Sequence, residues 1–476
     1  MTSKPYITTV GLEVHAELKT ETKMFCRSKN DPHAAQPNTH ICPVCMAYPG
    51  TLPVINKKAV HHVLRVGAAV NGALADFTEF DRKNYFYPDL PKGYQLSQYK
   101  FPLVVGGMLR DVALTRIHLE EDSARSQHLS DKEGGDEWSL VDYNRAGVPL
   151  MELVTEPVIH DAKTAALFAQ ELQLLLRTLG ASDANMEKGE MRVEANISVS
   201  QDSAVFGTKV EVKNLNSFKS VEKAIEYEVA RHITLLEKRE QIVQETRGWD
   251  ETKQKTFSQR LKENSQDYRY FPDPDLPKLY LSRIPEFTLK NIVSSLPELP
   301  AQKRERYIAL GVKNSDAEML VFDFSFATFF DQEVLAKTTD KNKIKIASNY
   351  LLSDVRGAYA DSLDKFAGGV FFELVELVES NQLSSRGAKE VLAVIAKEGG
   401  RPLDVAKSKG FLQVHDIAQL KTYAEEVVSE NPAVVADLKA GKESALQFLV
   451  GQGMKKSKGS ANPKELAELI KSELGL

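Results

Sequence analysis

The sequence lacks the features that mark secreted and membrane proteins. Its 476 residues contain only 3 cysteines, which is too few for a disulfide framework. No apolar run approaches the roughly 20 residues that are needed to cross a bilayer. The first residues have no apolar core of the kind found in signal peptides. We therefore expect a protein of the cytoplasm, or of another reducing compartment, that has no membrane partner.

Common nucleotide-binding and nucleophile motifs are also absent. There is no phosphate loop of the Gly-x4-Gly-Lys-Ser/Thr type and no dinucleotide fingerprint. No cysteine lies in a glycine-flanked nucleophile turn, and there is no Ser-Ser-Gly-rich amidase stretch. A protein of this kind that used ATP would have to hold the phosphates through metal and basic side chains.

Length and charge set further bounds. A chain of 476 residues is too long for a single core, so two or three domains are expected. The net charge of −5 gives no overall attraction for nucleic acid, so any such contact must come from a local patch.

Residues 10–18 carry the strongest strand pattern in the chain. One face is apolar, and the other presents Glu13, His15 and Glu17. A Glu-His-Glu face cannot enter an apolar core without large desolvation costs. Residues 191–199 and 209–213 repeat this alternation, and we predict that the three segments belong to one antiparallel sheet. An ordinary solvated sheet surface is the alternative for any single strand.

Two further segments add carboxylates to the predicted polar face. Residues 115–122 contain a histidine and adjacent glutamates, and an apolar run about thirty residues later contains another glutamate. Glutamate oxygens favour magnesium or manganese, and a neutral imidazole can join them. On a regular strand Glu121 is out of phase with Glu120, so only one of the two is expected to face the site. The predicted magnesium ligands are Glu13, His15, Glu120, Glu121 and Glu152.

The helical signals indicate the domain organisation. Asp161 caps a predicted helix over 162–179, and Ser217 or Ser220 opens a second helix that continues to Lys238. Beyond a proline-rich boundary near residue 296 the pattern is helical almost throughout. We predict domains at 1–292, 293–405 and 406–476.

The cysteines suggest a metal loop. Cys26, Cys42 and Cys45 have zinc-ligand spacing but fall one short of the usual structural tetrahedron. His33 or His40 could complete the set, with Ser28 a weaker candidate. The alternative is three unconnected thiols.

Long, ordered motifs occur at residues 10–18, 80–89, 119–122, 144–157, 212–218, 268–275 and 448–463. Together these motifs resemble the B subunit of the glutamyl/aspartyl-tRNA amidotransferase, and the resemblance covers the whole chain. It implies an α+β fold with a glutamine-synthetase-like antiparallel-sheet cradle, a helical domain and a small all-α tail that touches tRNA. It also implies a heterotrimer in which an A subunit hydrolyses glutamine and a small C subunit holds the pair together. Zinc-bearing members have a cysteine where this chain has Ser28, so the resemblance leaves zinc open.

The expected chemistry follows from the carboxylate that must become an amide. Ammonia will not displace hydroxide, so ATP must first phosphorylate the carboxylate, and a divalent ion must neutralise the charge between the reactants. Without a glutaminase motif, the ammonia must arrive from a partner. The predicted catalytic residues are Glu13, His15, Glu121, Glu152, Arg192 and Lys213, and the predicted ATP-binding residues are Arg116, Lys209 and Glu194.

Two other segments receive functional predictions. Asp81, Lys83 and Asn84 begin an aromatic-rich run that we expect to line the ammonia route, although the neighbouring tyrosines could instead have a structural role. Lys455, Lys456 and Lys458 lie in a glycine-rich turn between predicted helices at 445–450 and 463–474, where a phosphate could approach the backbone.

Two rival functions stay open at this level. One is a stand-alone ligase of glutamine-synthetase type, and the other is a tRNA-binding scaffold without chemistry. The substrate expected from the resemblance is Glu-tRNA(Gln), Asp-tRNA(Asn) or both.

Overall fold

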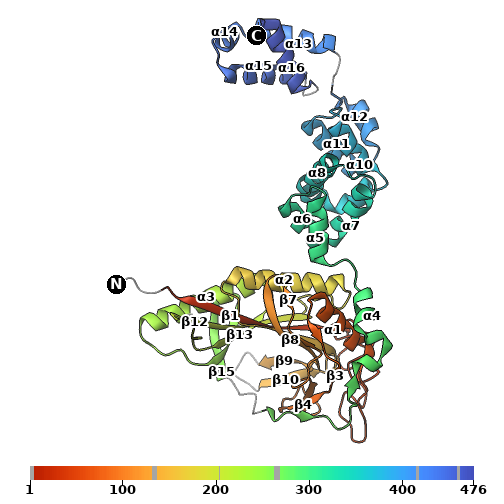
Figure 1. Cartoon of the computed structure of the whole chain (residues 1–476), viewed down its shortest axis with the longest axis vertical. Coiled ribbons are helices and arrows are strands. Elements are labelled where there is room, and N and C mark those ends of the chain that lie inside the picture. Colours follow the sequence, from red (N-terminus) through yellow and green to blue (C-terminus); the bar gives the residue numbers. More distant parts are fainter. Residues whose placement is uncertain (1–4, 131–136, 203, 262–267, 414–416, 458–460) are drawn as a thin grey trace. The chain divides into compact units, whose positions relative to one another are not determined.

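The computed structural model describes residues 5–130, 137–202, 204–261, 268–413, 417–457 and 461–476 (Figure 1). The chain forms two compact units, Met1–Leu299 and Pro300–Leu476. The three predicted domains, 1–292, 293–405 and 406–476, stay predictions.

A large sheet organises the first unit. It is 10-stranded, with the order β15-β14-β13-β12-β1-β11-β8-β6-β2 and with β7 paired to β8. Strand β1 therefore lies in the interior of the sheet, between β12 and β11. The strands are β1 (Ile7–Glu17), β2 (Ala73–Leu74), β6 (Val104–Val105), β7 (Met108–Leu109), β8 (Val112–Glu121), β11 (Pro149–Thr155), β12 (Met191–Ser200), β13 (Val210–Leu215), β14 (Glu245–Asp250) and β15 (Lys255–Leu261).

The sheet is mixed, which corrects the prediction of a purely antiparallel one. The predicted neighbours β1, β12 and β13 are antiparallel to one another. Strands β13 and β14, however, are parallel. The long helix α3 (Phe218–Glu237) connects them, and a strand–helix–strand crossover returns the chain in the same direction.

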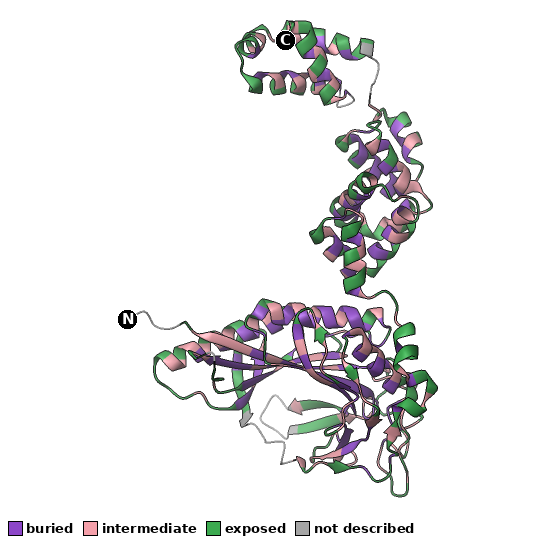
Figure 2. Cartoon of the chain, viewed as in Figure 1, coloured by how far each residue is buried: buried purple, intermediate pink, exposed green. Residues whose placement is uncertain are grey.

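Two helices cover the apolar face of the sheet (Figures 1 and 2). Helix α2 (Ala162–Thr178) begins after Asp161, whose carboxylate accepts from the Thr164 N–H at 2.8 Å. Helix α3 begins after Ser217, whose hydroxyl accepts from the Ser220 N–H at 3.0 Å. Both predicted helices are confirmed, and Ser217 is the cap. Their buried side chains share one core with the apolar residues of β1, namely Val10, Leu12, Val14 and Ala16.

Smaller sheets lie in the same unit. One is three-stranded and places β4 (Asp81–Asn84) between β5 (Tyr94–Ser97) and β16 (Phe271–Pro272). Strand β3 (Phe77–Thr78) pairs with β17 (Leu279–Tyr280), and β9 (Arg125–Ser130) pairs with β10 (Glu137–Asp142). Helix α1 (Lys57–Ala69) packs against β8, and α4 (Leu289–Ser294) packs against α1.

The second unit is helical in its described residues. Residues of α13, α14, α15 and α16 form a separate apolar core that includes Leu420, Leu449 and Leu466. Among the described residues, none of the helices has both the length and the apolar character needed to cross a bilayer. The principal helices are α5 (Pro300–Ala309), α6 (Asn314–Phe322), α7 (Phe324–Phe330), α8 (Lys341–Tyr350), α10 (Val370–Glu379), α11 (Ser385–Glu398), α12 (Pro402–Lys409), α13 (Ile417–Glu430), α14 (Pro432–Lys439), α15 (Glu443–Lys456) and α16 (Pro463–Leu474).

A buried carboxylate ties α3 to the edge of the large sheet. Glu228 is fully buried and accepts from Arg231 on its own helix at 2.8 Å. It also pairs with Arg247 of β14 at 3.1 Å and accepts from the hydroxyl of Thr256 on β15. Burial alone would raise the pKa of Glu228, but hydrogen bonds from His232 and Arg231 outweigh burial and lower it to about 2.

We predict that Glu228→Gln destabilises the protein at neutral pH and does so progressively less in acid. A carboxyl pKa depressed in the folded state contributes stability above its unfolded value, and this contribution is lost as the pH falls towards the folded value. The lost contribution is at most about 3 kcal/mol, since one pKa unit corresponds to about 1.4 kcal/mol. Urea unfolding at pH 7, 5 and 3.5 measures the difference between the two proteins. Glu226→Gln, on the exposed side of the same helix, is the control, and a pH-independent difference would contradict the prediction.

Candidate active site

The polar face of β1 meets polar side chains from both neighbouring strands. His15 lies opposite Glu152 of β11 and opposite Arg192 of β12. Glu152 in turn lies opposite His118 of β8. Directly opposed residues in an antiparallel pair share a face, so these four side chains form one row across the sheet.

A potential metal site lies in this row. His15 Nε2 is 3.4 Å from Glu152 Oε2 and 3.7 Å from Glu120 Oε1. His118 Nε2 is also 3.4 Å from Glu152 Oε2, and the hydroxyl of Ser97 donates to Glu120 Oε2 at 3.2 Å. Two carboxylates and one imidazole suit a hard divalent ion such as magnesium or manganese. His118 and Ser97 would orient the ligands from outside, as second-layer hydrogen bonds do in metal sites. We call His15, Glu120 and Glu152 the first acidic cluster.

The first acidic cluster balances its charge internally. Burial alone would lower the pKa of His15, but Glu152 and Glu120 outweigh burial and raise it to about 9. Burial would raise the pKa of Glu152, yet His118 and His15 hold it well below its usual range. A proton on His15 thus compensates the buried carboxylates. A divalent cation would supply the same compensation and would displace this proton.

Glu13 belongs to a second acidic cluster with Glu194 and Glu211. The ammonium of Lys213 lies 2.9 Å from Glu194 and 3.9 Å from Glu211, and Asn196 donates to Glu13 at 2.9 Å. Burial raises the pKa of Glu13, and Glu152 and Glu194 raise it further. Glu13 and His15 lie two residues apart on the same face of β1, so the two clusters are neighbours.

Glu121 does not belong to either cluster, which corrects its assignment as a magnesium ligand alongside the others. Its carboxylate pairs with Lys92 and accepts from the Leu96 N–H at 2.9 Å. Side chains alternate between the two faces of a strand, so Glu121 lies with Ile117 and Leu119 on the face of β8 opposite to Glu120. Of the adjacent glutamates, Glu120 is the one that faces His15. The predicted magnesium ligands therefore divide into separate groups.

The predicted phosphate-binding cations occupy different environments. Arg116 lies 3.5 Å from Glu152, so it borders the first acidic cluster. Arg192 pairs with Asp122 at 3.0 Å, and the negative charge of Asp122 raises the pKa of Arg192 more than any other influence. Sequence reasoning did not identify Asp122 as the partner of Arg192, although Asp122 directly follows Glu120 and Glu121. Lys209 is exposed and directly precedes β13.

The predicted channel residues lie on β4. Asp81 is buried and accepts from the Tyr99 N–H at 3.0 Å. Asn84 donates to the carbonyls of Tyr268 and Arg269, at 3.2 and 2.9 Å. The ammonium of Lys83 lies 5.0 Å from the centre of the Tyr268 ring. Burial alone would lower the pKa of Lys83, but nearby groups, led by Glu120, raise it above its usual range. Lys83 is therefore a neighbour of the first acidic cluster.

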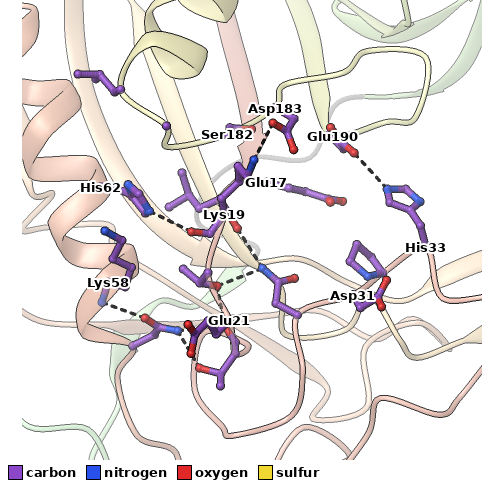
Figure 3. A pocket seen from close by; sticks show the side chains of 18 of the residues that line it. Glu17, Lys19, Glu21, Asp31, His33, Lys58, His62, Ser182, Asp183 and Glu190 are labelled. Carbon is purple, nitrogen blue, oxygen red and sulfur yellow. Dashed lines mark hydrogen bonds and ion pairs between the residues drawn. The ribbon is translucent and has the colours of Figure 1, made fainter. Parts of the chain in front are cut away.

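A cavity of about 880 Å³ opens at the carboxyl end of β1 (Figure 3). Glu17 lines it, and burial raises the pKa of this carboxyl to about 8. Two contacts join opposite walls of the cavity: the Lys19 ammonium lies 2.9 Å from Asp183, and the His33 ring lies 3.6 Å from Glu190. Sequence reasoning missed this cavity, because its walls come from segments far apart in the chain.

The cysteines do gather, but the predicted histidine ligands are elsewhere. The sulfurs of Cys42 and Cys45 are 3.8 Å apart, and Cys26 completes the group. His33 contacts Arg125, and His40 lies 3.7 Å from Asp31, so neither joins the thiols. Completion of the set by a histidine is therefore wrong.

The neighbours of the thiols do not fit zinc. Ser28 Oγ lies 3.8 Å from the sulfur of Cys45, and the fully buried ammonium of Lys23 lies 4.0 Å from the same sulfur. A hydrogen bond from Cys26, with help from Lys23, lowers the pKa of Cys45 to about 5. A structural zinc site needs four ligands and a net anionic environment. Here the polar group beside the three thiols is the hydroxyl of Ser28 instead of a fourth thiolate, and the ammonium of Lys23 already supplies positive charge.

We predict that the purified protein holds less than about 0.1 zinc per chain, because a structural zinc site needs a closed four-ligand set. The variant Ser28→Cys/Lys23→Met completes the thiolates and removes the competing cation, so it should bind close to one zinc per chain. Elemental analysis after dialysis measures both. One zinc in the wild-type protein, lost when the cysteines become serines, would contradict the prediction.

The tail lysines differ from one another. Lys456 is paired with Glu426 and Glu430 of α13, at 2.8 and 2.6 Å. Lys455 is exposed, and Lys458 lies outside the described residues. Both described lysines belong to α15, so the prediction that they lie in a turn is wrong.

Comparisons with known proteins place the chain in a family. The family described as GatB/GatE catalytic domain matches residues 8–284, and the family described as GatB domain matches residues 329–474.

Similar proteins extend over nearly the whole chain. The B subunit of the aspartyl/glutamyl-tRNA(Asn/Gln) amidotransferase of Thermus thermophilus is 43% identical over 480 residues, covering 99% of this chain and 100% of that protein. The proteins of that name from Carboxydothermus hydrogenoformans and Crocosphaera subtropica are 40% and 42% identical, and each alignment covers at least 97% of both chains. The chain belongs to the family of aspartyl/glutamyl-tRNA(Asn/Gln) amidotransferase B subunits.

Proposed function

We propose that the polar face of the large sheet converts the side-chain carboxylate of Glu-tRNA(Gln), Asp-tRNA(Asn) or both into the amide. As the B subunit of an amidotransferase, the chain is part of a glutamine-hydrolysing ligase. The observation that carries the location of the chemistry is the first acidic cluster, with His15 3.4 Å and Arg116 3.5 Å from Glu152.

The reaction needs ATP because hydroxide is a poor leaving group. ATP transfers its terminal phosphoryl group to the substrate carboxylate and leaves as ADP. Ammonia then attacks the acyl carbon, the C–O bond to phosphate breaks, and phosphate and one proton leave. Magnesium, when bound, would neutralise the negative charge of the donor phosphate and the acceptor carboxylate. Glu120, Glu152 and His15 would hold one ion, and Glu13, Glu194 and Glu211 have the oxygen donors to hold another.

The basic residues would hold the anionic reactants. Arg116 lies 3.5 Å from Glu152 and would contact the transferred phosphoryl group. Lys213 borders the second cluster and would contact the remaining phosphates. Arg192, fixed by Asp122, would hold the substrate, and Lys209 stays a candidate for outer ATP contacts.

The partners follow from the missing glutaminase motifs. We propose a cytoplasmic complex in which an A subunit supplies ammonia and a small C subunit holds the pair together. The α+β first unit would act as a glutamine-synthetase-like cradle, and Asp81, Lys83 and Asn84 would border the ammonia route. The clusters argue against a scaffold without chemistry, since such a scaffold would not need buried carboxylates beside lysine and arginine.

We predict that His15→Ala and Glu152→Gln each lower amide formation at least about 100-fold, because both remove a first-cluster ligand. Glutamine hydrolysis by the partner and assembly of the complex should stay within twofold of wild type. Product formation from misacylated tRNA, measured with and without excess magnesium, tests this expectation. His128→Ala, an exposed histidine of β9, is the control. Normal amide formation in both variants would refute the site.

We predict that removing residues 417–476 raises the KM for tRNA at least about 10-fold and flattens its salt dependence, because phosphate contacts are salt-sensitive. This segment has its own core, so its loss should leave partner glutaminase activity intact. Lys455→Ala should weaken tRNA binding more than Lys456→Ala, since Lys456 is already paired with two glutamates. Equal tRNA affinities at low and high salt with and without the tail would contradict a tRNA-binding role.

A further inference from the structure

We infer that Tyr268 is a positioning residue for amidation, because its ring and that of Tyr85 hold the Lys83 ammonium on the side of β4 that faces the first acidic cluster. This inference rests on the function proposed above. It assigns a task to the segment 268–270, which is remote in sequence from every predicted catalytic residue.

The strand register places Lys83 beside the cluster. In the β4–β5 pair, Lys83 lies opposite Gln95, and Asp81 lies opposite Ser97. Alternate residues of a strand share a face, so Lys83 and Ser97 are on the same side of this small sheet. Ser97 donates its hydroxyl hydrogen to Glu120 at 3.2 Å. The face that carries Lys83 is therefore the face turned towards the first acidic cluster.

Aromatic rings surround the ammonium. Lys83 Nζ lies 5.0 Å from the ring centre of Tyr268 and 5.8 Å from that of Tyr85. The two rings are 6.0 Å apart and meet edge to face. A cation within about 6 Å of an aromatic ring centre is attracted by the ring quadrupole, most strongly where water is excluded. The rings thus restrict where the flexible chain of Lys83 can point.

The segment that carries Tyr268 is fastened to β4 itself. Asn84 donates to the carbonyls of Tyr268 and Arg269, at 3.2 and 2.9 Å. Strand β16 pairs Phe271 with Arg82 of β4. The guanidinium of Arg82 also pairs with Asp273 at 2.6 Å. Contacts on both sides of Tyr270 therefore fix the distance between the Tyr268 ring and the Lys83 side chain.

A cation held in this place serves the proposed reaction. Negative charge grows on the acyl oxygen and the phosphate as ammonia attacks the phosphorylated carboxylate. A preorganised ammonium stabilises that charge without first having to reorient. A mobile lysine would instead lose part of this benefit, and the activated substrate would be hydrolysed more often before ammonia arrived. Coupling between ATP use and amide formation should therefore depend on the Tyr268 ring.

The decisive comparison uses Tyr268→Phe and Tyr268→Leu in the reconstituted amidotransferase complex. Phenylalanine keeps the aromatic face, and leucine keeps apolar bulk without it. We expect Tyr268→Phe to stay within about twofold of wild type and Tyr268→Leu to form about tenfold less amide per ATP consumed, in the range of a desolvated cation–π contact. Thermal unfolding and the KM for misacylated tRNA should be the same in both variants.

The control is Tyr280→Leu, which removes another tyrosine of the same unit that stacks on a cation. Arg283 lies 4.2 Å from the centre of the Tyr280 ring, and neither residue borders the clusters. This variant should keep wild-type coupling. If Tyr268→Leu fails to fold, the pair Tyr85→Phe and Tyr85→Leu makes the same comparison on the other ring.

A double variant separates this inference from the proposed function. Lys83→Met should lower coupling more than Tyr268→Leu, and the double variant should be no worse than Lys83→Met alone, because the ring acts through the lysine. Additive losses, or equal coupling in Tyr268→Phe and Tyr268→Leu, would overturn the role of Tyr268. Normal amide formation in His15→Ala would instead overturn the proposed site.

Discussion

The alternating side chains of strand β1 face an apolar core on one side of the sheet and a polar surface on the other. It lies between β12 and β11, so it has no free edge, and its apolar side chains are fully buried against α2 and α3. Each buried Val or Leu contributes about 1.5–3 kcal/mol, and a slip of one residue would turn the glutamates and His15 into that core. The register of the central strand is therefore fixed by the hydrophobic effect. The positions of the metal-binding candidates follow from it.

The fixed register of β1 brings glutamates together on one face of the sheet, and the surrounding side chains compensate their negative charge. His118 and His15 lower the pKa of Glu152, while Lys213 pairs with Glu194. Arg192, which lies opposite His15, pairs with Asp122, and Lys92 pairs with Glu121 on the other face of β8. A buried carboxylate without such a partner would cost several kcal/mol. The sheet surface is thus arranged as carboxylate clusters bordered by fixed cations, which is the pattern that phosphoryl transfer from ATP requires.

Much of this arrangement could be predicted from the sequence because it depends on strand period and helix caps. The alternation on β1 and β12 and the start of α2 at Asp161 are local signals. The phase difference between Glu120 and Glu121 indicated that only one would face His15, and the structure identifies Glu120. The parallel strand β14 and the remote positions of His33 and His40 depend on how distant segments pack, which no local pattern records. The contact between Lys83 and Tyr268 also depends on the packing of distant segments.

The pairing of β16 with β4 has a consequence for biosynthesis. Phe271 joins Arg82, so the polypeptide must close a loop of nearly two hundred residues before this three-stranded sheet is complete. Such distant pairings carry a large loop-closure entropy and form late in folding. A nascent chain that has emerged from the ribosome only as far as β15 already contains the strands that carry both acidic clusters. It still lacks the segment that encloses Lys83. The first acidic cluster and Lys83 thus acquire this neighbouring segment only after nearly the entire first unit has been translated.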